Sequence, residues 1–317
     1  MAEQEPGTAG RPAEHLADQG AGASGWQWLA GGGVCSPLGY RAGATACGLK
    51  ASGRDDLALL ALDRPAAAAG LFTRSALPAA PVLLDRERLA GPAAAAGGVR
   101  GVVVNAGVAN ACTGEGGLED ARAMGEAAAA ALVCRPEQVL VLSTGVIGRR
   151  LDMGKVRHGI RGAAARLRPD GGSELARAIM TTDTVSKEAA VELRLAGGTV
   201  RLGAAAKGAG MIHPDMATLL AVVTTDAALG ADDLAALLLE AADASFNRIS
   251  VDGDTSTNDS LLLLANGAGG VTLESAEDRA AFAAALTALC RRLALAVVRD
   301  GEGARRLAAI TVREAAS

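Results

Sequence analysis

The segment from Lys207 to Leu220 places a hydroxyl residue, Thr218, at the start of an apolar strand and behind an approach broken by Pro214. A main-chain break between Ala217 and Thr218 would give Thr218 a free α-amino group. Because the pKa of such a group is roughly 7.7–8.0, it could take the proton from the hydroxyl of its own residue. One residue would then supply both nucleophile and base. The alternative is an ordinary loop entering a buried strand, since strands are commonly flanked by Gly and Pro.

Four further blocks accompany this segment. They are Asn105-Ala-Gly-Val-Ala-Asn-Ala-Cys-Thr-Gly114, Ser143-Thr-Gly-Val-Ile-Gly148, Ile179-Met-Thr-Thr-Asp-Thr184 and Phe246-Asn-Arg-Ile-Ser-Val-Asp-Gly-Asp-Thr-Ser-Thr-Asn-Asp259. In this order, from about residue 42 to residue 313, the chain resembles the ornithine acetyltransferase family. That family transfers the acetyl group of N-acetylornithine to glutamate in arginine biosynthesis, and its members cut themselves before a nucleophilic threonine. The resemblance therefore favours self-cleavage at Ala217–Thr218 over an ordinary loop.

The resemblance also implies an oxyanion hole at Thr144 and Gly145. These residues follow the apolar run 139–142 and precede a predicted helix. A hydroxyl and a backbone N–H in such a strand-to-helix turn can converge on the oxygen of a tetrahedral intermediate. The alternative is that Gly145 only makes the turn.

Substrate binding is implied for Thr181, Lys207 and Glu302, together with Thr218. Lys207 is one of four lysines in a chain that otherwise uses arginine for positive charge, which suggests that a compact ammonium is needed there. The carboxylate of Glu302 suits an ammonium group of ornithine. The alternatives are an exposed strand-end lysine, an ordinary loop hydroxyl and a solvated glutamate. No cofactor and no metal are implied, because the acetyl group travels on the threonine oxygen.

The acidic run from Asp252 to Asp259 begins like a calcium-binding loop. It has Thr257 at the sixth position and Leu263 at the twelfth, where such a loop needs Gly and Glu. We expect this run to shape the site, or the joint between the two cleaved pieces.

Composition excludes several function classes. The 317 residues are 50% hydrophobic, and 31 basic and 35 acidic side chains give a net charge of −4 without a strongly basic stretch. This predicts neither nucleic-acid nor membrane binding and favours small-molecule substrates. The five cysteines are widely spaced and form no C-x-x-C pair, which argues against a disulfide framework and a zinc site. Residues 1–6 lack the basic start of a signal peptide, so we expect a cytoplasmic protein.

Hydrophobic patterns predict a mixed α/β fold. Expected strands cover residues 57–62, 101–104, 139–142 and 218–225, expected helices cover residues 118–134, 153–167 and 231–244, and residues 191–202 read as a hairpin turning at Gly197-Gly198. The resemblance sharpens this to two β-sheets between helical layers, α-β-β-α, of the self-cleaved N-terminal-nucleophile type.

The expected organisation is a disordered tail (residues 1–25), an α-chain (26–217) and a β-chain (218–317), assembled as a heterotetramer of two α and two β chains. Members of the family continue past the point that matches Ser317, so the β-chain is shorter than theirs. Three functions remain open: the acetyltransferase of arginine biosynthesis, a related acyltransferase or amide hydrolase of a specialised pathway, and an inactive, shortened member.

Overall fold

The computed structural model describes residues 25–213 and 219–314. Ala217, Thr218 and the first 24 residues of the predicted tail lie outside the described residues. The strands are β1 (Trp26–Trp28), β2 (Tyr40–Thr45), β3 (Leu57–Phe72), β4 (Val99–Val108), β5 (Val139–Val146), β6 (Lys187–Leu195), β7 (Gly198–Lys207), β8 (Leu220–Thr225) and β9 (Ser260–Ala265). The helices are α2 (Ala80–Leu89), α3 (Pro92–Ala95), α4 (Gly114–Leu132), α5 (Met153–Ala164), α6 (Gly172–Ala178), α7 (Ala231–Asp243) and α8 (Ala276–Arg299), with 3-10 turns η1 (Pro136–Gln138) and η2 (Phe246–Arg248).

The strands form two sheets that share β3. The first sheet has the order β2-β3-β4-β5, and the second has the order β1-β6-β7-β8-β9-β3. Residues 57–62 of β3 pair with β2 and β4, whereas residues 67–72 pair with β9. The register shifts between Ala61 and Ala66, around Pro65, which has no N–H to donate. This irregularity lets one strand pass from the first sheet to the second.

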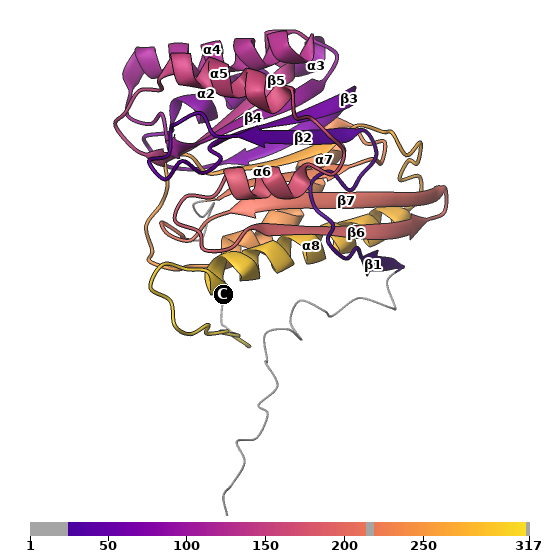
Figure 1. Cartoon of the computed structure of the whole chain (residues 1–317). Coiled ribbons are helices and arrows are strands. Elements are labelled where there is room, and N and C mark those ends of the chain that lie inside the picture. Colours follow the sequence, from indigo (N-terminus) through magenta and orange to yellow (C-terminus); the bar gives the residue numbers. More distant parts are fainter. Residues whose placement is uncertain (1–24, 214–218, 315–317) are drawn as a thin grey trace, which may run out of the picture.

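The two sheets pack face to face and are covered by helices on both outer sides (Figure 1). Apolar residues of both sheets, among them Leu60, Val102, Leu140, Val222 and Leu262, are buried together between the layers. Helices α2, α4 and α5 cover the outer face of the first sheet, and α7 and α8 cover the outer face of the second. The predicted α-β-β-α arrangement is confirmed.

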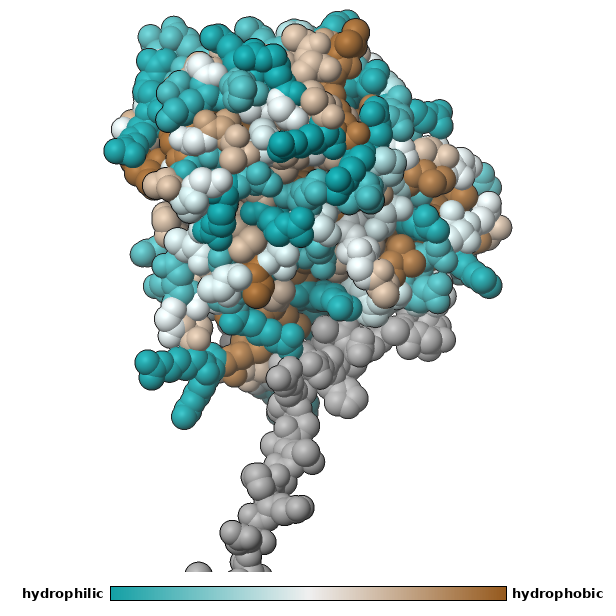
Figure 2. Space-filling model, in the orientation of Figure 1, coloured by the Kyte–Doolittle hydropathy of each residue, from teal (hydrophilic) through white to brown (hydrophobic). Residues whose placement is uncertain are grey.

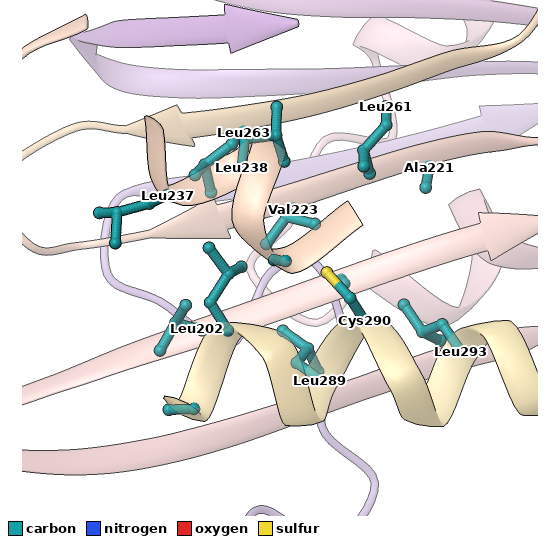
Figure 3. Packing of buried hydrophobic residues seen from close by; sticks show 14 of the residues in the cluster. Leu202, Ala221, Val223, Leu237, Leu238, Leu261, Leu263, Leu289, Cys290 and Leu293 are labelled. Carbon is teal, nitrogen blue, oxygen red and sulfur yellow. The ribbon is translucent and has the colours of Figure 1, made fainter. Parts of the chain in front are cut away.

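Helix α8 completes the core on the side of the second sheet. In the part of the chain that the structure describes, it alone is long and apolar enough to cross a membrane by length and composition. However, Leu289, Cys290 and Leu293 are buried against Val223 and the neighbouring strands (Figure 3). Figure 2 shows a face with mainly hydrophilic side chains and only small, separate hydrophobic groups. The structure therefore uses α8 as a core helix.

Local boundaries differ from the predictions at several places, and two of these differences concern turns. The hairpin of β6 and β7 pairs Leu195 with Gly198, so its turn is Ala196–Gly197, one residue earlier than predicted. The first sheet also extends further: β5 continues to Val146 instead of turning after residue 142.

Candidate active site

A cavity of about 750 Å³ opens where the ends of β5 and β7 meet the loops before β6 and β9. Its volume is typical of a site for a small molecule. Thr144, Gly145, Thr181, Lys207 and Glu302 all line it. The structure thus brings together every predicted site residue that it describes. Ala217 and Thr218, the predicted cleavage residues, lie outside the described residues.

Thr144 and Gly145 lie in β5 itself, so the predicted strand-to-helix turn at this pair is wrong. Gly145 pairs with Gly107 of the parallel strand β4 and has φ +133. A Cβ added there would overlap the main chain of Gly107. Only glycine therefore fits this close approach, which keeps β5 extended past Thr144.

Buried polar contacts fix the ends of β4 and β5 beside the cavity. Asn258 Nδ2 donates to the carbonyl oxygens of Ala109 and Ser143 at 2.7 and 2.8 Å. Ser143 Oγ donates to Asn105 Oδ1 at 2.6 Å. Thr144 is held between these anchored residues with 7% of its surface exposed, within a rigid frame.

Lys207 is buried, not exposed as a strand-end lysine would be. It keeps 4% of its surface exposed, and its Nζ donates to Thr181 Oγ1 at 2.6 Å. Burial lowers the pKa of Lys207, and the negative charge of Asp183, whose Oδ2 lies 3.8 Å from Nζ, opposes that shift. An ammonium and a hydroxyl therefore meet on one wall of the cavity.

A buried ionic network supports this wall, and sequence reasoning did not find it. Asp183 Oδ1 accepts from Lys187 Nζ and from the N–H of Gly208, both at 2.7 Å. Lys187 Nζ also lies 2.6 Å from Asp300 Oδ2. Burial raises the pKa of Asp183, but Lys207 and Lys187 outweigh it, and the net pKa lies below its usual range. The ion pairs thereby tie the end of α8 to β6 and β7.

Glu302 follows this network at the end of α8 and remains exposed at the cavity. Its N–H donates to the carbonyl oxygen of Ala209 at 2.7 Å. Its carboxylate lies against Gly210, where an added Cβ would come within 2.7 Å of Oε1. The acidic group therefore faces the stretch that leads from β7 to residue 213.

Lys50 is a second lysine at the cavity, and no role was predicted for it. Its Nζ donates to the carbonyl oxygens of Asp55 and Ala178 at 2.7 and 2.8 Å. Burial lowers its pKa to about 8. Asp56 holds the surrounding loop by accepting from the N–H groups of Cys47, Leu49 and Lys50. The scarcity of lysine was the available signal, since three of the four lysines lie at or behind this cavity.

Comparison with known proteins identifies the family of the chain. The ArgJ family model matches residues 41–317. A curated relative, the arginine biosynthesis bifunctional protein ArgJ of Symbiobacterium thermophilum, is 52% identical over 296 residues, which cover 92% of this chain and 72% of that protein. The structure of ornithine acetyltransferase complexed with ornithine, from Mycobacterium tuberculosis, is 40% identical with a TM-score of 0.54. It covers 62% of this chain and 100% of that chain.

The fold also occurs in a more distant protein. The l-aminopeptidase d-ala-esterase/amidase of Ochrobactrum anthropi, described as a variant of the Ntn-hydrolase fold, is 12% identical with a TM-score of 0.53 over 86% of both chains. The α-β-β-α architecture is thus that of an Ntn-hydrolase variant. Within it, the chain belongs to the ArgJ family.

Proposed function

We propose that the chain is an acetyltransferase of arginine biosynthesis that moves the acetyl group of N-acetylornithine to glutamate. The names of the relatives support this activity. One structural observation carries the proposal: Thr144, Gly145, Thr181, Lys207 and Glu302, which come from four separate parts of the sequence, line one cavity. The cavity offers an ammonium, hydroxyls and a carboxylate to substrates that carry both charges.

The nucleophile in this proposal is Thr218, freed by self-cleavage after Ala217. Lys207, at the end of β7, is the Cα partner of Leu220, at the start of β8. Leu220, two residues after Thr218, therefore lies beside a residue that lines the cavity. The match to the ornithine acetyltransferase structure gives further support. That solved chain, covered in full, corresponds to 62% of this one, close to the share between residue 25 and the Ala217–Thr218 bond.

Acetyl transfer would then follow two half-reactions. The Thr218 hydroxyl attacks the acetyl carbonyl of N-acetylornithine and gives its proton to the α-amino group, while Thr144 and Gly145 hold the oxyanion. The tetrahedral intermediate collapses, its C–N bond breaks, and ornithine leaves with that proton. The amine of glutamate attacks the threonine ester next, which releases N-acetylglutamate and restores the hydroxyl. The chain's own residues supply each step.

The two pieces would remain associated after cleavage. Strand β8 of the β-chain pairs with β7 of the α-chain on one side and with β9 on the other. The core of the second sheet also mixes residues from both sides of the cut. Separation would break a continuous sheet, so we propose a stable αβ unit that forms a heterotetramer.

Intact mass and activity test the proposal together. Wild-type protein is expected as two masses that meet at Ala217–Thr218, and it should convert N-acetylornithine and glutamate into ornithine and N-acetylglutamate. Thr218→Ala should give one uncut mass and no transfer. Active protein with an unbroken chain would refute the threonine mechanism. Ornithine release at the same rate without glutamate would indicate an amide hydrolase.

A further inference from the structure

The loop from Ser250 to Asp259, named the clamp loop here, contacts the chain on both sides of residues 213–218. On the upstream side, Asp252 accepts from the N–H groups of Met211 and Ile212 at 2.6 and 2.9 Å. The N–H of Val251 donates to the carbonyl oxygen of Ile212 at 3.0 Å. One loop residue therefore fixes two consecutive peptide groups just before the segment.

The downstream contact comes from the other end of the clamp loop. Asp259 Oδ1 accepts from the N–H of Leu219 at 3.0 Å, and the N–H of Ser260 donates to the carbonyl oxygen of Leu219 at 2.9 Å. Leu219 is therefore held through both its N–H and its carbonyl oxygen. Both ends of the segment are fixed to a single loop.

Two features indicate that these contacts do more than stabilise a loop. Met211 has φ +57, a left-handed conformation that is uncommon for a residue with a side chain and costs of order 1–3 kcal/mol. Asp259 is fully buried, and its Oδ2 has no hydrogen-bond partner within the described stretches 25–213 and 219–314. A native structure keeps strain and an unsatisfied buried oxygen chiefly where function requires them.

We propose that Asp252 and Asp259 are positioning residues for self-cleavage, which hold the chain at Met211–Ile212 and at Leu219, on either side of the bond that is cut. This inference rests on the proposed cleavage after Ala217. In that step the hydroxyl oxygen attacks the carbonyl carbon, the C–N bond breaks, and the hydroxyl proton passes to the nitrogen. Water then hydrolyses the resulting ester to a carboxylate and the free hydroxyl. Neither aspartate exchanges a proton in this sequence, since each acts through the main chain that it holds.

The numbers of hydrogen bonds predict a graded response. Asp252 uses both oxygens, so Asp252→Asn keeps one acceptor and Asp252→Ala keeps none. Asp259 uses only Oδ1, so Asp259→Asn keeps the bond to Leu219 and Asp259→Ala loses it. The loss of one hydrogen bond corresponds to a rate factor on the order of tenfold. Cleavage should slow by about tenfold in Asp252→Asn and Asp259→Ala and by about a hundredfold in Asp252→Ala, and Asp259→Asn should remain near wild type.

The experiment follows cleavage of the full chain by intact mass after synthesis, with thermal unfolding of each variant as a measure of folding. Asp233→Asn is the matched control, because it removes an exposed carboxylate of α7 that pairs with Arg279 in the first turn of α8. The control should cleave at the wild-type rate. If an alanine variant fails to fold, the two asparagine variants decide, because one is expected to be slow and the other normal. Folded variants that all cleave within twofold of wild type would overturn the inference while leaving self-cleavage intact, whereas an uncut wild type would refute the proposed function itself.

Discussion

Lys207 Nζ donates a 2.6 Å hydrogen bond to Thr181 Oγ1, and this bond joins the end of β7 to the loop between α6 and β6. Lys207 is buried, and the carboxylate of Asp183 lies 3.8 Å from its ammonium group. The hydroxyl of Thr181, which accepts from the lysine, keeps its own hydrogen for a further acceptor. The pair is therefore oriented to present one cationic and one hydroxyl donor to a substrate.

Thr181→Val should weaken substrate binding because it removes the hydroxyl and leaves Lys207 with one partner fewer. Loss of a buried hydrogen bond of this kind costs about 1–3 kcal/mol, or roughly tenfold to a hundredfold in kcat/KM. Steady-state kinetics with N-acetylornithine and glutamate measure the effect. Thr181→Ser keeps the hydroxyl and should stay near wild type. Equal kcat/KM values for the valine and serine variants would contradict a substrate-binding role for the Thr181 hydroxyl.

Thr144→Val should lower kcat without unfolding the protein. Valine has nearly the same shape as threonine but no hydroxyl, and one lost oxyanion donor typically costs on the order of 10²–10³ in kcat. Thr144 is buried within β5, so its methyl groups can occupy the same space. Unfolding temperature and self-cleavage should be recorded beside the kinetics. An unchanged kcat in fully cleaved protein would contradict an oxyanion role.

The neighbouring change Gly145→Ala should act on folding instead. A Cβ at Gly145 would overlap the main chain of Gly107, and backbone cannot move aside as a flexible side chain can. Its φ of +133 adds strain for any residue with a side chain. We expect a loss of about 4 kcal/mol or more, seen as insoluble protein or a sharply lowered unfolding temperature. Gly148→Ala is a suitable comparison, because a Cβ there meets nothing within 4 Å and only the positive φ of +81 opposes it.

Local elements with a strong hydrophobic pattern could be predicted from the sequence. The ends of elements could not be predicted where contacts with distant residues determine them. The apolar run 57–62 was recognised, but β3 continues through Pro65 to Phe72. Nothing local indicates this extension, because pairing with β9 at distant residues 260–265 keeps the alanine-rich half extended. The turn predicted at Thr144 was wrong for a related reason. Residues 143–146 stay extended because they pair with β4 around Gly107, and this partner is distant in sequence.

The residues of the candidate site were predicted by resemblance, but the buried ionic network that supports them was not. Motifs indicated Thr144, Gly145, Thr181, Lys207 and Glu302, and the structure places all of them at one cavity. Lys187 pairs with Asp183, four residues earlier in the chain, and with Asp300, which lies 113 residues away. No spacing rule reveals the pair with Asp300. An unusually rare lysine beside an acidic residue was the one local sign of it.

The last prediction concerns pH and Lys50. Burial lowers the pKa of Lys50 to about 8, whereas a lysine in the unfolded chain titrates near 10.4. Between these values the folded protein binds fewer protons at this site than the unfolded chain. Stability must therefore rise with pH across roughly pH 8 to 10.4 as far as Lys50 is concerned, and the cost of burying its charge is present in full below pH 8.

Lys50→Met removes the titrating group and with it this contribution. The difference in unfolding temperature between wild type and Lys50→Met should shift in favour of wild type as the pH is raised from 7 to 10, measured by thermal unfolding at several pH values. Comparing the two proteins cancels the effect of Lys207, whose pKa is also lowered by burial. Lys155→Met, which alters a half-exposed lysine on α5, is the control and should leave the pH dependence in place. A constant difference between wild type and Lys50→Met over this range would show that Lys50 is as well solvated in the folded protein as in the unfolded chain.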